Sequence, residues 1–175
     1  MKLFQNKLLL IGVVCAAPLV LGTLAYVYRW TPGEGGSYGE LIAPRLLSGP
    51  PFERLRGKWL LVAFDAAGCD AWCEKKLYFM RQVRRAQGKD MERVERLWVL
   101  TDAGKLRPEL LQAIEGTQVL HPGDSSFMNS FAGNPVDHIY VVDPLGNLMM
   151  RYPRDPDPSK MLKDLQRLMK FARSA

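Results

Sequence analysis

The sequence predicts an α/β domain built as a three-layer sandwich and preceded by one N-terminal transmembrane helix. Two continuous apolar runs, at residues 58–64 and 96–102, are typical of strands that are covered on both faces. Helical patterns follow each of these runs, which is the alternation that builds a parallel sheet with covering helices. A stretch of 21 residues without a charge, 8–28, is long enough to cross a hydrocarbon core of about 30 Å.

The charges around the apolar stretch predict its orientation. Lys2 and Lys7 precede it and Arg29 follows, a bias that places the N-terminus in the cytoplasm and the rest of the chain outside. A cleaved signal peptide would have a shorter apolar region and a small-x-small site, and a lipoprotein signal would have a small residue where Val14 precedes Cys15. We therefore expect residues 1–29 to form an uncleaved anchor in the inner membrane, with the domain on the periplasmic side.

A tether is expected to link this anchor to the domain. Residues 30–52 contain five Gly and four Pro, a composition typical of a linker that is partly flexible and partly stiffened. The sequence thus predicts an anchor at 1–29, a tether at 30–54 and a folded domain at 55–175.

The elements of the domain follow from apolar periodicity and from Gly and Pro positions. The first buried strand, 58–64, is followed by a helix over 70–87 whose apolar stripe ends at Gly88. After the second strand, 96–102, Pro108 opens a short helix over 107–116 and a third strand is expected at 117–121. The remaining elements are a helical turn or loop at 125–133, a strand hairpin at 138–143 and 147–153 joined by "PLG", and an amphipathic helix from 157 to the end.

The charge of the chain gives little indication of a partner. The formal net charge is +6, but three cations flank the anchor, which leaves 21 basic against 18 acidic residues in 30–175. That balance is ordinary for a protein surface and argues against nucleic-acid binding. No phosphate loop, dinucleotide fingerprint or nucleophile elbow is present in the sequence.

Two cysteines, Cys69 and Cys73, follow the first buried strand and open the next helix. A helix N-terminus favours the thiolate, the form that attacks disulfides and binds metals. Outside the cytoplasm such a pair is a disulfide, a redox couple or a metal clamp. In a regular helix three intervening residues place the α-carbons about 6 Å apart, so a bridge requires Cys69 to lie just before the helix. Two thiolates on one face also suit Cu(I).

The Cys-x-x-x-Cys motif after a strand, together with the later "DHIYVVDPLG", resembles the SCO/SenC family of membrane-anchored copper proteins. The resemblance implies a thioredoxin-like fold over residues 55–175. It also implies Cu(I) held by Cys69, Cys73 and a distal histidine, here His138. Asp70 and Glu74 stand where the family has prolines, and His138 lies six rather than about nine residues before Pro144. Three residues along a strand span about 10 Å and reverse the side-chain face.

The resemblance implies a role in cytochrome c oxidase biogenesis, as an assembly factor or metallochaperone rather than an enzyme. The first expectation is Cu(I) delivery through Cys69 and Cys73 to an oxidase subunit or another assembly factor. The alternatives are a thiol–disulfide reductase that acts on oxidase cysteines through the same pair, and a non-catalytic assembly factor with a static disulfide.

Other candidate residues have simpler interpretations. His121 is expected to be a loop histidine, and the methionines at 80, 128, 149 and 150 are expected to fill the core, although thioethers also bind Cu(I). The basic residues of the helix at 70–87 are expected to form a solvated face, with docking to an acidic partner or anionic lipid as the alternative. These residues are Lys75, Lys76, Arg81, Arg84 and Arg85.

Overall fold

The computed structural model describes residues 2–27, 36–121, 128, 130, 131 and 133–171, and the chain divides into two compact units. The first unit, Met1–Gly36, contains one helix, α1 (Lys2–Val27), which includes Pro18. None of the helices in the described ranges meets the length and apolarity needed to cross a membrane. The second unit, Ser37–Ala175, carries the folded domain.

The centre of the domain is a six-stranded sheet with the order β1-β6-β5-β2-β3-β4. Strands β2 (Trp59–Asp65), β3 (Val94–Leu100) and β4 (Thr117–Leu120) are parallel, as the sequence predicts. The predicted hairpin is also present, because β5 (Ile139–Val142) and β6 (Asn147–Tyr152) pair antiparallel and β5 lies beside β2. Every residue of β2 is buried, as expected for the middle of a covered sheet.

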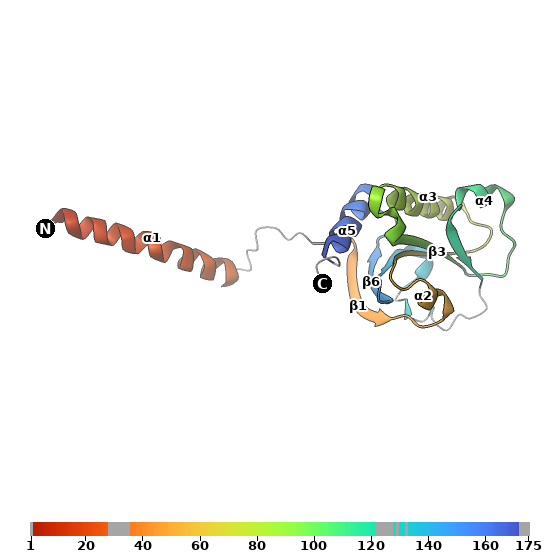
Figure 1. The fold of residues 1–175 in the computed structure, drawn as a ribbon, viewed down its shortest axis with the longest axis horizontal. Helices are drawn as coiled ribbons and strands as arrows, with labels where there is room; N and C mark the ends of the chain where they lie inside the picture. Colours follow the sequence, from red (N-terminus) through yellow and green to blue (C-terminus); the bar gives the residue numbers. More distant parts are fainter. Residues whose placement is uncertain (1, 28–35, 122–127, 129, 132, 172–175) are drawn as a thin grey trace. The chain divides into compact units, whose positions relative to one another are not determined.

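One face of the sheet is covered by three helices, α3 (Ala71–Arg85), α4 (Pro108–Ala113) and α5 (Pro158–Phe171) (Figure 1). Helices α3 and α5 contact each other, and Met161, Leu165 and Met169 of α5 pack in the same core cluster as Met80 and Val83 of α3. These three α5 residues share one face because their spacing of four follows the helical period. The amphipathic pattern of the C-terminal helix is therefore confirmed over its described part.

The opposite face of the sheet is covered by shorter segments. Phe52 of helix α2 (Pro50–Arg54), Phe131 and Leu47 pack against the alternate β2 residues in a second core cluster. A short 3₁₀ helix, η3 (Pro135–Asp137), leads into β5, and another, η1 (Gly88–Arg93), leads into β3. The two faces and the sheet between them form the predicted three layers.

The structure differs from the expected tether at its C-terminal half. Residues 40–46 form strand β1 (Glu40–Leu46), which pairs antiparallel with β6, and residues 50–54 form α2. The main-chain amide of Gly39 donates a 2.8 Å hydrogen bond to the Asp164 carboxylate on α5. The domain thus begins near Ser37 rather than residue 55, because an edge strand can be held by a single antiparallel neighbour even when it contains a proline, here Pro44. Most of the loop expected at 125–133 lies outside the described residues.

Candidate functional site: a buried cysteine pair at the end of β2

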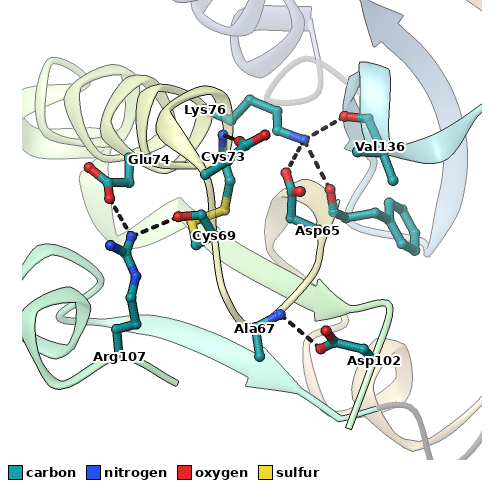
Figure 2. Close-up of a disulfide and its surroundings, with 11 residues drawn as sticks. Asp65, Ala67, Cys69, Cys73, Glu74, Lys76, Asp102, Arg107 and Val136 are labelled. Carbon is teal, nitrogen blue, oxygen red and sulfur yellow. Dashed lines mark hydrogen bonds and ion pairs between the residues drawn. A yellow bond between two sulfur atoms is a disulfide. The ribbon is translucent and has the colours of Figure 1, made fainter. Parts of the chain in front are cut away.

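Cys69 and Cys73 form a disulfide at the junction between β2 and α3 (Figure 2). The chain leaves β2 through a tight turn in which the amide of Cys69 donates to the carbonyl of Ala66 at 3.0 Å. Asp70 is the N-cap of α3, and its carboxylate accepts a 2.9 Å hydrogen bond from the amide of Cys73. The second cysteine therefore lies in the first turn of the helix, and the first cysteine precedes it.

The backbone of Cys69 explains how a pair with three intervening residues is bridged. Cys69 has φ of 42°, the one positive value at a non-glycine residue in the described chain, and its α-carbon lies 5.1 Å from that of Cys73. Residues other than glycine adopt this left-handed conformation at a cost of about 1–2 kcal/mol. A bridge across three intervening residues requires the first cysteine to lie outside the helix, and Cys69 lies there, before the N-cap Asp70.

Both cysteines are covered by apolar side chains. Cys69 is 2% exposed and Cys73 is 1% exposed, and they share a core cluster with Trp98 and with Leu110 and Ile114 from the α4 segment. A reactive disulfide is usually open to its partner on at least one sulfur. In this conformation another protein reaches the sulfur atoms only if the covering segment moves.

Arg107, which directly precedes α4, ties this covering segment to the helix that carries the disulfide. Its guanidinium donates a 2.7 Å hydrogen bond to the carbonyl of Cys69 and forms an ion pair with Glu74 (Figure 2). Both partners belong to the Cys-x-x-x-Cys region, so Arg107 fixes the start of α4 against the cysteine pair. Glu74 is thus one of the two groups through which Arg107 holds α4 in place.

A second tie joins the turn before Cys69 to the end of β3. The carboxylate of Asp102 accepts hydrogen bonds from the amide of Ala67 at 2.8 Å and from the amide of Gly104 at 3.2 Å. Because a carboxylate accepts from two amides at once, it holds both loops in one arrangement. Asp102 therefore holds the turn before Cys69 against the loop at 101–107.

Lys76 lies inside the protein rather than on the predicted solvated face of the helix. Its side chain is 1% exposed, and its ammonium group pairs with the carboxylate of Asp65 at the end of β2. The same ammonium donates to the carbonyl of Phe64 at 2.9 Å and to the carbonyl of Val136 in η3 (Figure 2). An ammonium has three donors and all three are used here, which is what allows a charged group to be buried.

Burial also changes the pKa of Asp65, the acidic member of this pair. Desolvation raises the pKa of Asp65 above its usual value, and the hydrogen bond and charge of Lys76 oppose this rise with a smaller effect. The pair connects three elements close to the disulfide: the end of β2, the second turn of α3 and η3. The sequence carries a signal for it, since Lys76 falls between Cys73 and Met80 at the spacing of the buried helix face.

His138 lies at the entrance to β5 and is partly buried. Its Nδ1 is 2.8 Å from the carbonyl oxygen of Tyr152, and since a carbonyl only accepts, this nitrogen carries the proton. The ring also packs edge-on against Tyr140 at 5.9 Å. In the described ranges no three His, Cys, Asp or Glu side chains gather in a metal-binding group, so the structure brings Cys69 and Cys73 together but does not add His138 to them.

The other candidate ligands also take structural positions. Met80 and Met150 are fully buried in the core beneath α3 and α5, and Met149 packs at the edge of that cluster. Met128 packs against the opposite face of the sheet. His121 is exposed at the end of β4. The expectation that the methionines fill the core is confirmed for these residues.

A mixed sheet covered by helices, with a cysteine pair at the junction of a central strand and a helix, defines a thioredoxin-like protein. The chain belongs to the family described as "Transmembrane-like, thioredoxin-like, C-terminal domain", which matches residues 59–172. No curated protein matches the sequence.

Solved structures show the same fold at low sequence identity. Apo Sco1 from Thermus thermophilus is 18% identical with a TM-score of 0.55, and the match covers 75% of this chain and 96% of that one. Yeast Sco1 with copper bound is 16% identical with a TM-score of 0.53, over 77% and 93% of the two chains. The exposed lipoprotein thioredoxin Etrx1 from Streptococcus pneumoniae is 15% identical with a TM-score of 0.50, over 71% and 99%. The predicted thioredoxin-like fold is confirmed.

Proposed function

We propose that the protein carries out thiol–disulfide exchange through Cys69 and Cys73, as a reductase of cysteines in a partner protein. The observation that carries this proposal is the closed bridge between the two residues at the N-terminus of α3. A dithiol that closes into a disulfide within one turn of chain can give up two electrons without a large rearrangement. The fold shared with the thioredoxin Etrx1 supports the same chemistry.

The exchange proceeds in two steps from the reduced pair. The Cys69 thiolate attacks one sulfur of the partner's disulfide, which forms a mixed disulfide and releases the partner's other sulfur as a thiolate. The Cys73 thiol, on losing its proton, then attacks Cys69 and releases the partner's second thiolate. The partner takes up two electrons, the two released thiolates take up protons, and the Cys69–Cys73 disulfide is restored to the state in this structure. A membrane or periplasmic dithiol must reduce this disulfide before the next cycle.

The burial of the pair sets a condition on this reaction. Because both cysteines are nearly inaccessible, the segment of Arg107 and α4 must swing away before a partner's sulfur can approach. Such a covering segment limits reaction with small oxidants and thiols and leaves reaction with a partner that displaces it. The interaction between Arg107 and the Cys69 region is thus a control on access.

The test is a redox titration of the full chain against defined ratios of reduced to oxidised dithiothreitol. Free thiols are alkylated at each ratio, and the mass of the protein then gives the fraction in which the cysteine pair is reduced. We expect a reversible two-electron transition at a potential above about −300 mV, the range in which structural disulfides give way to exchangeable ones. Cys69→Ser and Cys73→Ser should abolish turnover of a model peptide disulfide, and Cys15→Ser should leave it unchanged. A pair that stays oxidised well below that potential would instead be a static disulfide, as in a non-catalytic assembly factor.

Copper binding by the reduced pair is a second candidate. It is supported by the fold shared with yeast Sco1, which was solved with copper bound, and by the affinity of two thiolates for Cu(I). Cu(I) would then be cargo that passes to an acceptor site in cytochrome c oxidase. Cys69 and Cys73 fit this role only after reduction, since a disulfide offers no thiolate.

A Cu(I) competition titration on the reduced chain separates the two functions. Tight binding of one Cu(I) that is lost in Cys69→Ser and Cys73→Ser would support delivery, and a weaker complex in His138→Ala would add His138 as a ligand. Binding no tighter than that of an unrelated dithiol would exclude copper delivery, and the redox titration then decides between the reductase and a static disulfide.

We further propose that residues 1–29 anchor the protein in the inner membrane with the domain on the periplasmic side, and that its partners are oxidase subunits or oxidase assembly factors. The support is the uncharged run at 8–28, flanked by Lys7 and Arg29. Protease digestion of spheroplasts should remove the domain from the outside. Protection of the domain until the membrane is lysed would contradict this topology.

A further inference from the structure

Four arginines gather around a cavity of about 270 Å³ between α3 and the edge of the sheet. Arg81, Arg84 and Arg85 come from α3, which lies over β3 (Figure 1), and Arg96 comes from β3 itself. Glu115 and Gly116, just before β4, line the opposite wall. We refer to this site as the arginine cavity. It is separate from the cysteine pair, since neither Cys69 nor Cys73 lines it.

The deepest of these side chains is incompletely hydrogen-bonded. Arg96 is 3% exposed, and its Nη2 donates a 2.5 Å hydrogen bond to the carbonyl of Glu115. Its Nε and Nη1 are buried and have no acceptor in the part of the chain that the structure describes, and the same holds for Nε of Arg81. Buried guanidinium nitrogens normally have partners, because an unsatisfied charged donor costs several kcal/mol. Unused donors beside a cavity therefore point to a ligand that accepts hydrogen bonds.

The electrostatics at this position also favour an anion. Burial, followed by the charges of Arg84, Arg81 and Arg85, lowers the pKa of Arg96 to about 10, which still leaves it charged at neutral pH. Arg84 forms ion pairs with Glu92 and Glu95, each at 3.8 Å and thus beyond hydrogen-bond distance. The side chain of Glu115 also borders the cavity but is exposed to solvent. Positive charge thus remains in excess on the α3 wall.

Gly116 allows the guanidinium of Arg96 to lie against the turn before β4. It has φ of 72°, and a β-carbon at this position would come within 3.3 Å of Arg96 Nη2. A glycine meets both requirements, the left-handed backbone and the close approach. The cavity is therefore a formed feature of the fold and not only a gap between mobile surface arginines.

We propose that the arginine cavity binds a phosphate-class oxyanion. The oxygens of a phosphate group are arranged as a tetrahedron, so several guanidinium groups can donate to it from different directions, whereas the two oxygens of a carboxylate lie in one plane. The cavity is large enough for one such group. The group can belong to a free phosphate compound, which has three or four non-bridging oxygens, or to the diester headgroup of an anionic phospholipid, which has two, since both present charged phosphoryl oxygens.

Titration calorimetry on the full chain in an uncharged detergent tests this site. The two probes are inorganic phosphate and glycerophosphoglycerol, which is the soluble headgroup of an anionic phospholipid, each at constant ionic strength set with chloride. We expect saturable binding of at least one probe with one site per chain. Arg81→Gln and Arg85→Gln should each weaken it about fivefold or more, because each removes a guanidinium from the α3 wall.

Arg56→Gln is the matched control, because it removes the same charge at an exposed position that does not line the cavity. Its affinity should stay within about twofold of the unaltered chain. Arg96→Met should abolish binding. If that buried variant fails to fold, the two α3 variants still decide the matter, because their side chains are only partly buried or exposed.

Tighter binding of inorganic phosphate identifies a soluble phosphate compound as the ligand, and tighter binding of glycerophosphoglycerol identifies a lipid headgroup. The proposal is overturned if neither probe saturates above the chloride background. It is also overturned if Arg56→Gln weakens binding as much as the α3 variants, since the effect would then come from net charge alone.

Discussion

The ammonium of Lys76 and the carboxylate of Asp65 form an ion pair inside the domain, next to the helix turn that carries Cys73. Lys76 is the residue that connects β2, α3 and η3, because it also bonds the carbonyls of Phe64 and Val136. Removing one partner from a buried pair leaves the other charge uncompensated, at a cost of about 3–5 kcal/mol.

Lys76→Met should therefore lower the free energy of unfolding by about 3–5 kcal/mol, measured by urea denaturation. The matched control is Lys75→Met on the same helix. Lys75 pairs with Asp155 at the exposed surface, so its loss should cost no more than about 1 kcal/mol. Equal decreases in unfolding free energy for the two variants would show that the buried ion pair contributes no more to stability than the exposed one.

The raised pKa of Asp65 predicts a dependence of stability on pH. Because burial raises this pKa in the folded state, the folded protein binds the proton more readily than the unfolded chain does. The contribution of Asp65 to stability should therefore be most favourable at low pH and should fall as the pH rises from about 4 through the folded pKa. The check is the difference in unfolding free energy between the unaltered chain and Asp65→Asn, measured across that range. A difference that grows with pH over this interval would contradict the assignment.

Arg107→Met should make the disulfide easier to reach. The change removes the hydrogen bond to Cys69 and the ion pair with Glu74 while keeping the apolar part of the side chain. These contacts together contribute about 1 kcal/mol, which corresponds to about a fivefold increase in the open population. The measurement is the rate of reduction by dithiothreitol. Arg154→Met, an exposed arginine near Asp137, serves as control and should leave the rate unchanged.

The left-handed backbone at Cys69 predicts an unusual preference at that position. In a Cys73→Ser background, where no bridge can form, Cys69→Gly should be more stable than Cys69→Ala by about 1 kcal/mol. At most positions the order is the opposite, because glycine is more flexible in the unfolded chain. Thermal unfolding of the two variants compares them directly. A higher midpoint for the alanine variant would mean that the backbone relaxes once the disulfide is gone.

Gly39→Ala tests whether the domain begins before residue 40. A β-carbon at this buried position would clash with the side chain of Met150, and the amide of Gly39 donates a hydrogen bond to Asp164. Such overpacking typically costs about 1–3 kcal/mol. Gly36→Ala, just outside the folded unit, should change the unfolding free energy by less than about 0.5 kcal/mol. No effect of Gly39→Ala would place residue 39 in the tether after all.

The central sheet and its helices could be predicted from the sequence because their residues are buried in repeating patterns. The continuous apolar run of β2 and the spacing of Met161, Leu165 and Met169 in α5 are examples. Strand β1 lacked such a pattern, since nearly all of its side chains are exposed and its pairing to β6 depends on main-chain hydrogen bonds. Local composition alone indicated a linker there.

Only the local part of the candidate site could be predicted from the sequence, because its other contacts join residues that are far apart in the chain. The cysteine pair and its place at the helix N-terminus follow from the order of the elements, but closure of the disulfide depends on a single backbone angle at Cys69. The ion pair of Lys76 joins residues from separate elements, and a lysine is expected to be exposed. Arg107 lies 38 positions from Cys69, a contact that only the folded loop creates.

The sequence and pairing of the edge strand β1 have a consequence where many copies of the protein are close together. This strand lies at one border of the sheet, and it carries Pro44, charged Glu40 and Arg45, and an irregular register between Leu41 and Arg45. Proline supplies no amide, and a shifted register prevents a continuous row of free main-chain groups from facing outward. Copies crowded together would therefore find no continuous template at this edge for joining their sheets, which protects against aggregation through β1.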